Sequence, residues 1–140
     1  MKLKGILKTW RVAGSTAMAE LFGGMGLSGP TWEILTTLTY APVIAVDVSL
    51  GNHFQVTVTD GVAFAIGAPT NTPPTGKAQL IFITIRNGSG GAHGAGTFNA
   101  IFKTSGAVPA IANGNSRTFA FRWNGTNWVE VFRTAADVAN

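Results

Sequence analysis

The sequence of 140 residues is 46% hydrophobic and only 11% charged, which argues against intrinsic disorder and predicts one domain with a real core. It contains no cysteine, which excludes a disulfide framework, a cysteine-based zinc site and a thiol nucleophile. No apolar run reaches the ~18–20 residues that span a membrane, and the first residues lack the unbroken apolar stretch of a signal peptide. We therefore expect a protein made in the cytoplasm, with no membrane partner.

The first 30 residues differ from the rest and are predicted to form an extended docking arm. Four of the ten basic residues lie within the first 11 positions, whereas the 129 residues after Arg11 carry six basic and six acidic side chains and balance to zero. Only one short helix is expected in this arm, over residues 16–22, and helices that short are marginal in water. The residues expected to dock on a partner are Lys2, Lys4, Lys8, Trp10 and Arg11.

The charge of this arm suits an acidic protein surface as well as it suits nucleic acid. Nucleic acid is not expected as a partner, because four charges with no basic patch elsewhere make a weak electrostatic footprint. Gly24, Gly26 and Gly29 match the GxGxxG spacing of dinucleotide-binding proteins. That motif requires a preceding strand and a following helix, and here Pro30 and a strand-like stretch follow, so no cofactor is expected.

From residue 32 onward, apolar and polar residues alternate with the period of half-buried β-strands. Glycine, proline, asparagine and aspartate mark turns between the alternating stretches. Eight strands are predicted, over residues 32–39, 43–47, 53–59, 62–67, 78–86, 96–103, 116–123 and 127–133. The expected fold is all-β, an antiparallel β-sandwich or jelly-roll-like barrel of about eight strands over residues 31–140, preceded by the docking arm.

Two segments in this region differ from simple alternation. Residues 80–85 (LIFITI) are apolar on both faces, which predicts either a central strand or a strand whose second face meets another subunit. Residues 87–96 are glycine-rich but lack the Lys-Ser/Thr pair of a phosphate-binding loop. They are interpreted as a flexible connection that could contact a partner.

The segment FRWNGTNWVEVFRT, residues 121–134, predicts a β-hairpin, because Asn124-Gly125 is a strong turn signal. The same turn, Asn124-Gly125-Thr126, matches a glycosylation sequon. Glycosylation would need a secretory route, which the sequence does not indicate. Trp123 continues an apolar face and is expected in the core. A mixed face on the second strand is the candidate surface for recognition or inter-subunit contact, formed by Trp128, Glu130 and Phe132. The structural alternative for Glu130 is an ion pair with Arg122 across the hairpin.

No motif in the sequence calls for catalysis. The two histidines, His53 and His93, have no neighbouring ligand or base at the spacing that a metal or nucleophile site needs. Asp47 and Asp60 lie at strand ends, where aspartate is favoured for its turn hydrogen bonds. No metal, no catalytic residue and no enzymatic activity are therefore expected, although a pair of carboxylates formed only in space stays open.

Residues 36–133 resemble a module found in structural proteins of tailed bacteriophages. The resemblance rests on turn and strand phrases: Thr37-Leu-Thr-Tyr-Ala, Val46-Asp-Val-Ser-Leu-Gly-Asn-His-Phe, Ala68-Pro-Thr-Asn, Ile85-Arg-Asn-Gly-Ser-Gly-Gly, Ala112-Asn-Gly and Phe121-Arg-Trp-Asn-Gly-Thr-Asn-Trp-Val-Glu. It implies a virion-surface part of the tail-fibre, head-fibre or capsid-decoration type, usually a homotrimer.

The expected function is therefore that of a non-enzymatic virion structural protein, either a capsid decoration (cement) protein or a head fibre. The basic arm would dock it on a larger virion protein, such as a major capsid or tail protein. The alternative is a tail-fibre or receptor-binding module that recognises a host-surface glycan through exposed aromatic side chains.

Overall fold

The computed structural model describes residues 33–140. The predicted docking arm, with Lys2, Lys4, Lys8, Trp10 and Arg11, lies outside the described residues, as do the short helix and the glycine motif expected before residue 31. Residues Glu33–Asn140 form one unit. Its elements are β1 (Leu35–Thr37), β2 (Val43–Ile44), the 3-10 helix η1 (Val48–Leu50), β3 (His53–Val58), β4 (Phe64–Ile66), β5 (Leu80–Asn87), β6 (Gly96–Phe98), β7 (Phe102–Lys103), β8 (Asn115–Trp123), β9 (Trp128–Arg133) and β10 (Val138–Ala139).

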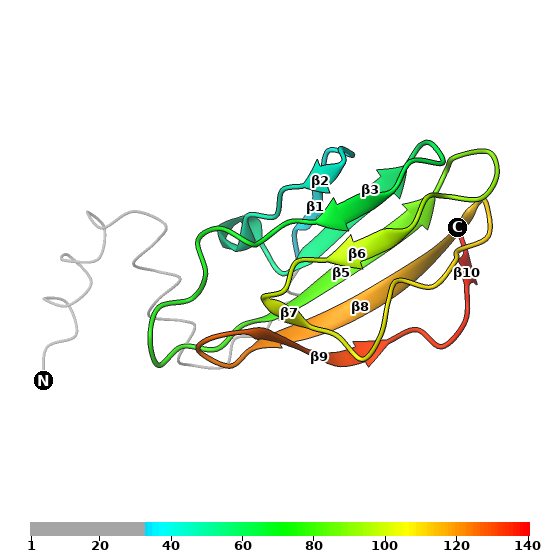
Figure 1. Cartoon of the computed structure of the whole chain (residues 1–140). Helices are drawn as coiled ribbons and strands as arrows, with labels where there is room; N and C mark the ends of the chain where they lie inside the picture. Colours follow the sequence, from blue (N-terminus) through cyan, green and yellow to red (C-terminus); the bar gives the residue numbers. More distant parts are fainter. Residues whose placement is uncertain (1–32) are drawn as a thin grey trace, which may run out of the picture. The chain divides into compact units, whose positions relative to one another are not determined.

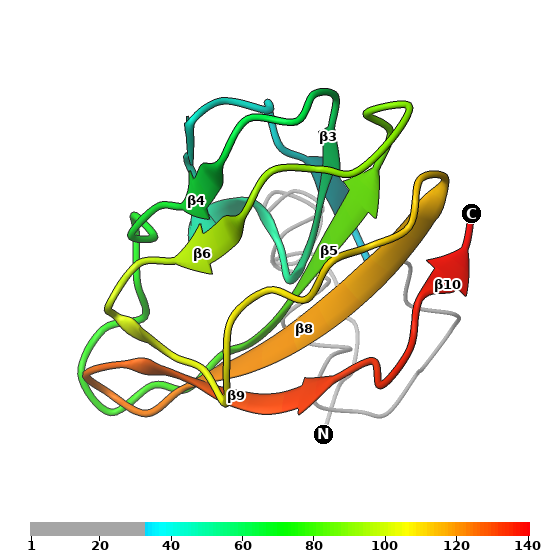
Figure 2. The same cartoon turned by 45° about the vertical axis from the view of Figure 1, so that its right-hand side comes forward.

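The strands form two sheets (Figure 1). The large sheet has seven strands in the order β1-β3-β5-β8-β9-β7, and β10 pairs with the first residues of β8. The small sheet has the order β2-β4-β6. A second view shows β4 and β6 lying over one face of the large sheet (Figure 2). The all-β prediction is confirmed.

From β1 to β6 the chain alternates between the two sheets. Each strand of the large sheet is followed by one of the small sheet, so β1, β3 and β5 pair in parallel, and so do β2, β4 and β6. Parallel neighbours need a crossover connection, and here a strand of the opposite sheet supplies it. Only β8 makes antiparallel pairs, with β5, β9 and β10. The expectation of antiparallel sheets is therefore wrong, because alternation reports which side chains are buried and not the direction of the neighbouring strand.

The number of strands also differs from the prediction, because one predicted strand is split and one strand is additional. The strand expected over residues 96–103 is split into β6 and β7 by a turn at Asn99, whose side-chain oxygen accepts the Ile101 N–H at 3.1 Å. The strand β10 was not predicted, since two residues show no measurable period.

One hydrophobic core joins both sheets. Along β5, Ile81, Ile83 and Ile85 are buried, whereas Leu80 and Phe82 lie on the opposite face. The same alternation along β3 buries Phe54, Val56 and Val58. These side chains cluster with residues of the small sheet, among them Ile44, Phe64 and Ile66. We call the face of the large sheet that carries this core the inner face, and its opposite the outer face.

The predicted hairpin between β8 and β9 is confirmed. Its loop spans residues 124–127, and the Asn124 side-chain oxygen accepts the N–H groups of Thr126 at 3.0 Å and Asn127 at 2.8 Å. Gly125 takes the left-handed φ of 99° that glycine tolerates. The hairpin is not regular, because Phe121 lies opposite Glu130 while Ala120 lies opposite Phe132. Val131 is the extra residue of a β-bulge, so side chains on either side of it follow different alternation.

Candidate functional site

The β-bulge separates the three residues that the sequence places on one recognition face. Trp128 is 0% exposed and its ring centroid lies 5.2 Å from that of Trp123, so it belongs to the core and is not a surface platform. Phe132, two residues beyond Glu130, is 57% exposed on the outer face. The predicted common face of Trp128, Glu130 and Phe132 is therefore wrong. Period-two counting fails across a bulge because the extra residue moves every later side chain to the opposite face.

Glu130 forms a structural ion pair. Its side chain is 5% exposed and binds the Arg133 guanidinium through both carboxylate oxygens, with 2.6 Å between Oε2 and one terminal nitrogen. The Ser105 N–H donates to the same Oε2 at 2.7 Å, and Arg133 donates to the carbonyls of Gly106 and Ala107. Arg133 is the main cause that holds the pKa of Glu130 below its ordinary value. The expected Arg122 partner is wrong, since Arg122 lies opposite Val129 on the outer face.

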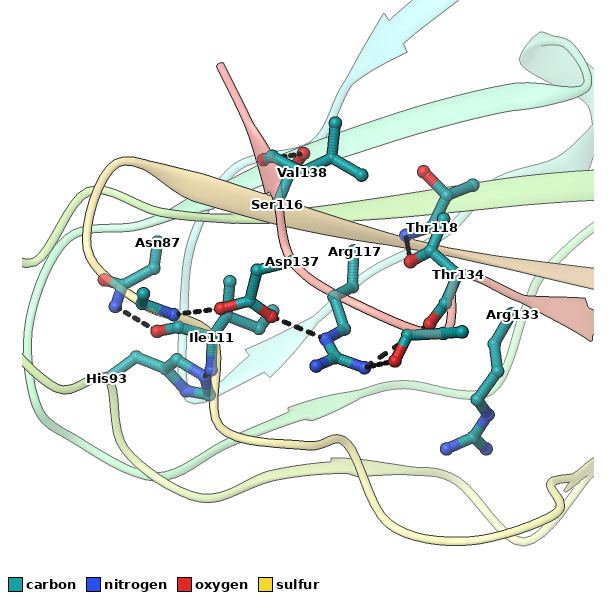
Figure 3. A network of polar contacts seen from close by, with 12 residues as sticks. Asn87, His93, Ile111, Ser116, Arg117, Thr118, Arg133, Thr134, Asp137 and Val138 are labelled. Carbon is teal, nitrogen blue, oxygen red and sulfur yellow. Dashed lines mark hydrogen bonds and ion pairs between the residues drawn. The ribbon is translucent and has the colours of Figure 1, made fainter.

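The glycine-rich segment 87–96, expected to be a flexible connection, makes several side-chain hydrogen bonds to the rest of the domain. The His93 Nε2 accepts the Ile111 N–H at 2.9 Å, and Figure 3 shows the two residues side by side. The His93 Nδ1 lies 2.6 Å from the Gly94 carbonyl oxygen, to which it donates. The side chain of Asn87, 1% exposed, donates to the carbonyls of Gly91 and Ile111. Both ring nitrogens of His93 are thus used structurally.

The C-terminal residues are tied to the same end of the large sheet. Arg117 Nε donates to Asp137 Oδ1 at 2.7 Å, and the second oxygen of Asp137 accepts the Ala112 N–H at 2.7 Å (Figure 3). The Ala112 N–H, followed by Arg117, lowers the pKa of Asp137. Arg117 also donates to the carbonyls of Thr134 and Ala135. We call the side chains of Asn87, His93, Arg117 and Asp137, with the backbone groups that they bind, the polar clamp.

One row of residues across the outer face of the large sheet is exposed at both of its ends. Strand register aligns one residue from each of five strands in a line across the sheet, and we call this line the central row: Leu35, His53, Phe82, Ala120 and Phe132. Leu35 and Phe132 at its ends are each 57% exposed. His53 stacks on Phe82 with ring centroids 4.6 Å apart, and its Nε2 contacts the Glu33 carboxylate. None of the described residues covers the two ends of this row.

A cleft of about 570 Å³ opens beside the central row, at the β8–β9 loop. Two cationic side chains, Lys77 and Arg122, line it together with the apolar side chains of Val129 and Val131. Trp123 borders it, and the Trp123 N–H donates to the Gln79 carbonyl at 2.9 Å, which ties β8 to the segment that carries Lys77. No sequence motif contains both of these cations, which lie 45 positions apart. Alternation with Phe121 and Trp123 places Arg122 on the outer face, but no pattern links it to Lys77.

The structure offers no metal centre or membrane-spanning helix within residues 33–140. No group of three or more histidine, cysteine, aspartate or glutamate side chains converges there, and no helix of this region is long and apolar enough to cross a bilayer. Asp47 and Asp60 accept the backbone N–H groups of Ser49 at 3.0 Å and Val62 at 2.9 Å, respectively, the role expected of aspartates at turns. Comparisons with protein families, with curated proteins and with solved structures found no match to this chain.

Proposed function

We propose that this protein is a non-enzymatic structural module of a tailed-phage particle that assembles with copies of itself through the outer face of its large sheet. The observation that carries the proposal is the central row, whose two ends expose large apolar side chains. Leu35, Leu80 and Phe132 are 57%, 42% and 57% exposed on this face, and large apolar side chains that gather exposed on one face of a folded domain mark an interaction site. The resemblance of residues 36–133 to phage modules supplies the class of assembly, a homotrimer on a virion surface.

A second copy of the chain fits this face because the centre of the face carries no net charge. The central row itself contains no aspartate, glutamate, lysine or arginine, its His53 contacts the neighbouring Glu33 carboxylate, and the next row across the sheet contains Gln55, Thr84 and Thr118. The hydroxyls of Thr84 and Thr118 are bonded to each other at 2.8 Å. A neutral, apolar and hydroxyl-lined face meets its own copy without like-charge repulsion, whereas a charged face would not.

The proposed architecture of the domain is a β-sandwich, supported by the single core that side chains of both sheets share. The alternation of β1–β6 between the sheets favours a sandwich over a jelly roll, whose strands are antiparallel. The basic residues of the arm, from Lys2 to Arg11, would attach this domain to a larger virion protein such as a major capsid or tail protein. A decoration protein or head fibre is the role that this combination favours.

The oligomer is tested by native mass spectrometry of the full chain. We expect a species of three chains, each of 14.6 kDa, and its loss in the variant Phe132→Asp, which would bury an unpaired carboxylate in the interface. Val43→Asp is the matched control, because Val43 is 65% exposed on the small sheet. A wild-type chain that is monomeric at micromolar concentration would remove the self-assembly proposal.

Attachment to the particle is tested separately. Replacing Lys2, Lys4, Lys8 and Arg11 by glutamate in the full chain should abolish co-sedimentation with purified particles of the phage that carries the gene, while the trimer stays intact. If the charge-reversed trimer still binds particles, docking through the arm is wrong. A receptor-binding role, as in a tail fibre, is the second candidate, and the cationic cleft is the observation that favours it.

A further inference from the structure

The two cations of the cleft, Lys77 and Arg122, have no carboxylate beside them, unlike two arginines elsewhere in the domain. Arg117 and Arg133 are each bonded to a carboxylate, those of Asp137 and Glu130. Within residues 33–140, neither Lys77 nor Arg122 forms an ion pair or a side-chain hydrogen bond, and no acidic residue lines the cleft. Two cations in one concave site, with no anion of the described chain beside them, create a positive potential that attracts an anionic ligand.

The acidic side chains of the described region are occupied elsewhere. Asp47 accepts from Ser49 and the Asn71 amide, Asp60 accepts from Tyr40 and the Val62 N–H, and Glu33 contacts His53. No carboxylate of residues 33–140 is therefore left to neutralise the cleft from within the same domain. The ligand that complements Lys77 and Arg122 must come from outside it.

The walls of the cleft are fixed before a ligand arrives. Gln79, which follows the lining residue Ala78, anchors one wall, since its carbonyl accepts from the Trp123 N–H while its amide donates to the Val48 carbonyl at 2.9 Å and to Asn52 at 2.8 Å. On the opposite wall, Asn124 closes the β8–β9 loop with its own side chain. A site whose frame is already ordered loses little conformational entropy on binding.

The size and lining of the cleft identify the class of ligand. A volume of about 570 Å³ lies in the range of small-molecule sites and far exceeds the volume of a single inorganic anion. The guanidinium of Arg122 presents the planar fork that pairs with a carboxylate, and Lys77 adds a second positive charge. Val129 and Val131 supply an apolar surface of the kind against which the C–H face of a sugar ring packs.

We propose that this cleft binds an acidic sugar, a monosaccharide unit that carries a carboxylate, as found in anionic surface polysaccharides. The carboxylate lies between Arg122 and Lys77, and the sugar ring lies against Val129 and Val131. This adds a ligand to the module and does not rest on its proposed assembly, since the cleft lies within one chain.

The test is a titration of the full-length protein with galacturonic acid, followed by the backbone amide signals in NMR spectra. Galactose is the matched probe, because it has the same ring without the carboxylate. We expect galacturonic acid to shift the amides of Lys77, Gly125 and Val129 in a saturable, salt-sensitive way, and galactose at the same concentration to leave them unchanged. Arg122→Gln and Lys77→Gln should each weaken binding about tenfold. Arg86→Gln, which removes an outer-face cation that does not line the cleft, should not weaken it.

Three results would overturn this proposal. Equal shifts with galactose would show that the charge is not recognised. Binding of sulfate or acetate as tight as that of galacturonic acid would show a simple anion site without sugar recognition. A cleft that binds none of these probes, combined with loss of the wild-type oligomer in Arg122→Gln, would show that an acidic side chain of a neighbouring copy fills it. Native mass measurements on Phe132→Asp keep the two proposals apart, because that variant should lose the trimer and keep the ligand.

Discussion

The arginines at the two ends of the large sheet differ in whether a carboxylate of the same domain pairs with them. At the polar clamp, Arg117 binds Asp137 and two backbone carbonyls, so its charge is neutralised by the chain itself (Figure 3). At the β8–β9 loop, Arg122 lies in an open cleft beside Lys77, and no carboxylate of residues 33–140 lines that cleft. Both arginines lie on β8, five residues apart in the sequence. Their neighbours, and not their residue type, separate a structural cation from a candidate ligand-binding one.

The contrast shows at which end of the sheet polar side chains are needed to hold the fold together. The polar clamp fastens three segments without regular structure, residues 88–95, 104–114 and 134–137, which lack a strand ladder to satisfy their backbone. The hairpin end needs no such fastening, because β8 and β9 satisfy each other and the β8–β9 loop is closed by Asn124. Its cations are therefore available for a partner.

The largest expected effect comes from a core residue beneath the β8–β9 hairpin, Trp128. Trp128→Ala should destabilise the domain by about 4 kcal/mol, because it removes a fully buried indole that packs on Trp123. Urea denaturation followed by circular dichroism would measure it. Trp128→Phe should cost much less, since the indole N–H has no acceptor within the described residues and phenylalanine removes that unpaired donor. Equal losses in the two variants would contradict the core assignment.

The second prediction breaks the polar clamp through its backbone. A Cβ atom at Gly94 would lie 2.1 Å from the carbonyl carbon of Val62, so Gly94→Ala should force the His93 segment away from β4 and cost about 3 kcal/mol. Gly91→Ala is the matched control, because nothing lies within 4 Å of a Cβ atom there. Thermal unfolding of the two variants would compare them. A loss confined to Gly91→Ala, or shared equally, would show that the segment is not packed as described.

The sequence predicts which side chains are buried and where the hairpin turns, but not the strand directions, the β-bulge or the cleft. The periods of β3 and β5 predict which of their side chains are buried, and Asn124-Gly125 predicts the hairpin. Strand direction is not encoded by period, so the parallel pairing of β3 with β5 was missed. Trp128, Glu130 and Phe132 alternate regularly in the sequence, but the bulge at Val131 moves Phe132 to the outer face in space. Lys77 and Arg122 meet only through folding, so the cleft has no local signal.

The third prediction concerns pH. The folded protein holds the pKa of Glu130 below the ordinary glutamate value of about 4.3, with Arg133 as the main cause. The stabilisation is therefore fully present above that value and is lost as the pH falls through it toward the pKa of the folded state. The free energy of unfolding should decrease from about pH 5 downward. In Glu130→Gln the decrease should be shallower, although Asp137 still contributes, and an unchanged slope would contradict the buried ion pair.

The smallest expected effect tests the comparison between the two arginines directly. Arg117→Gln should destabilise the domain more than Arg122→Gln does, because it leaves Asp137 without its cation and frees two backbone carbonyls. Arg122→Gln should change stability by less than about 0.5 kcal/mol, since surface substitutions that break no contact rarely do more. Both values come from urea denaturation at neutral pH. If Arg122→Gln costs as much as Arg117→Gln, the cleft cation contributes to the fold and is not reserved for a ligand. If neither substitution matters, the polar clamp contributes little to stability, and the loops it joins are held by their apolar contacts, such as that of Ile111 with the core.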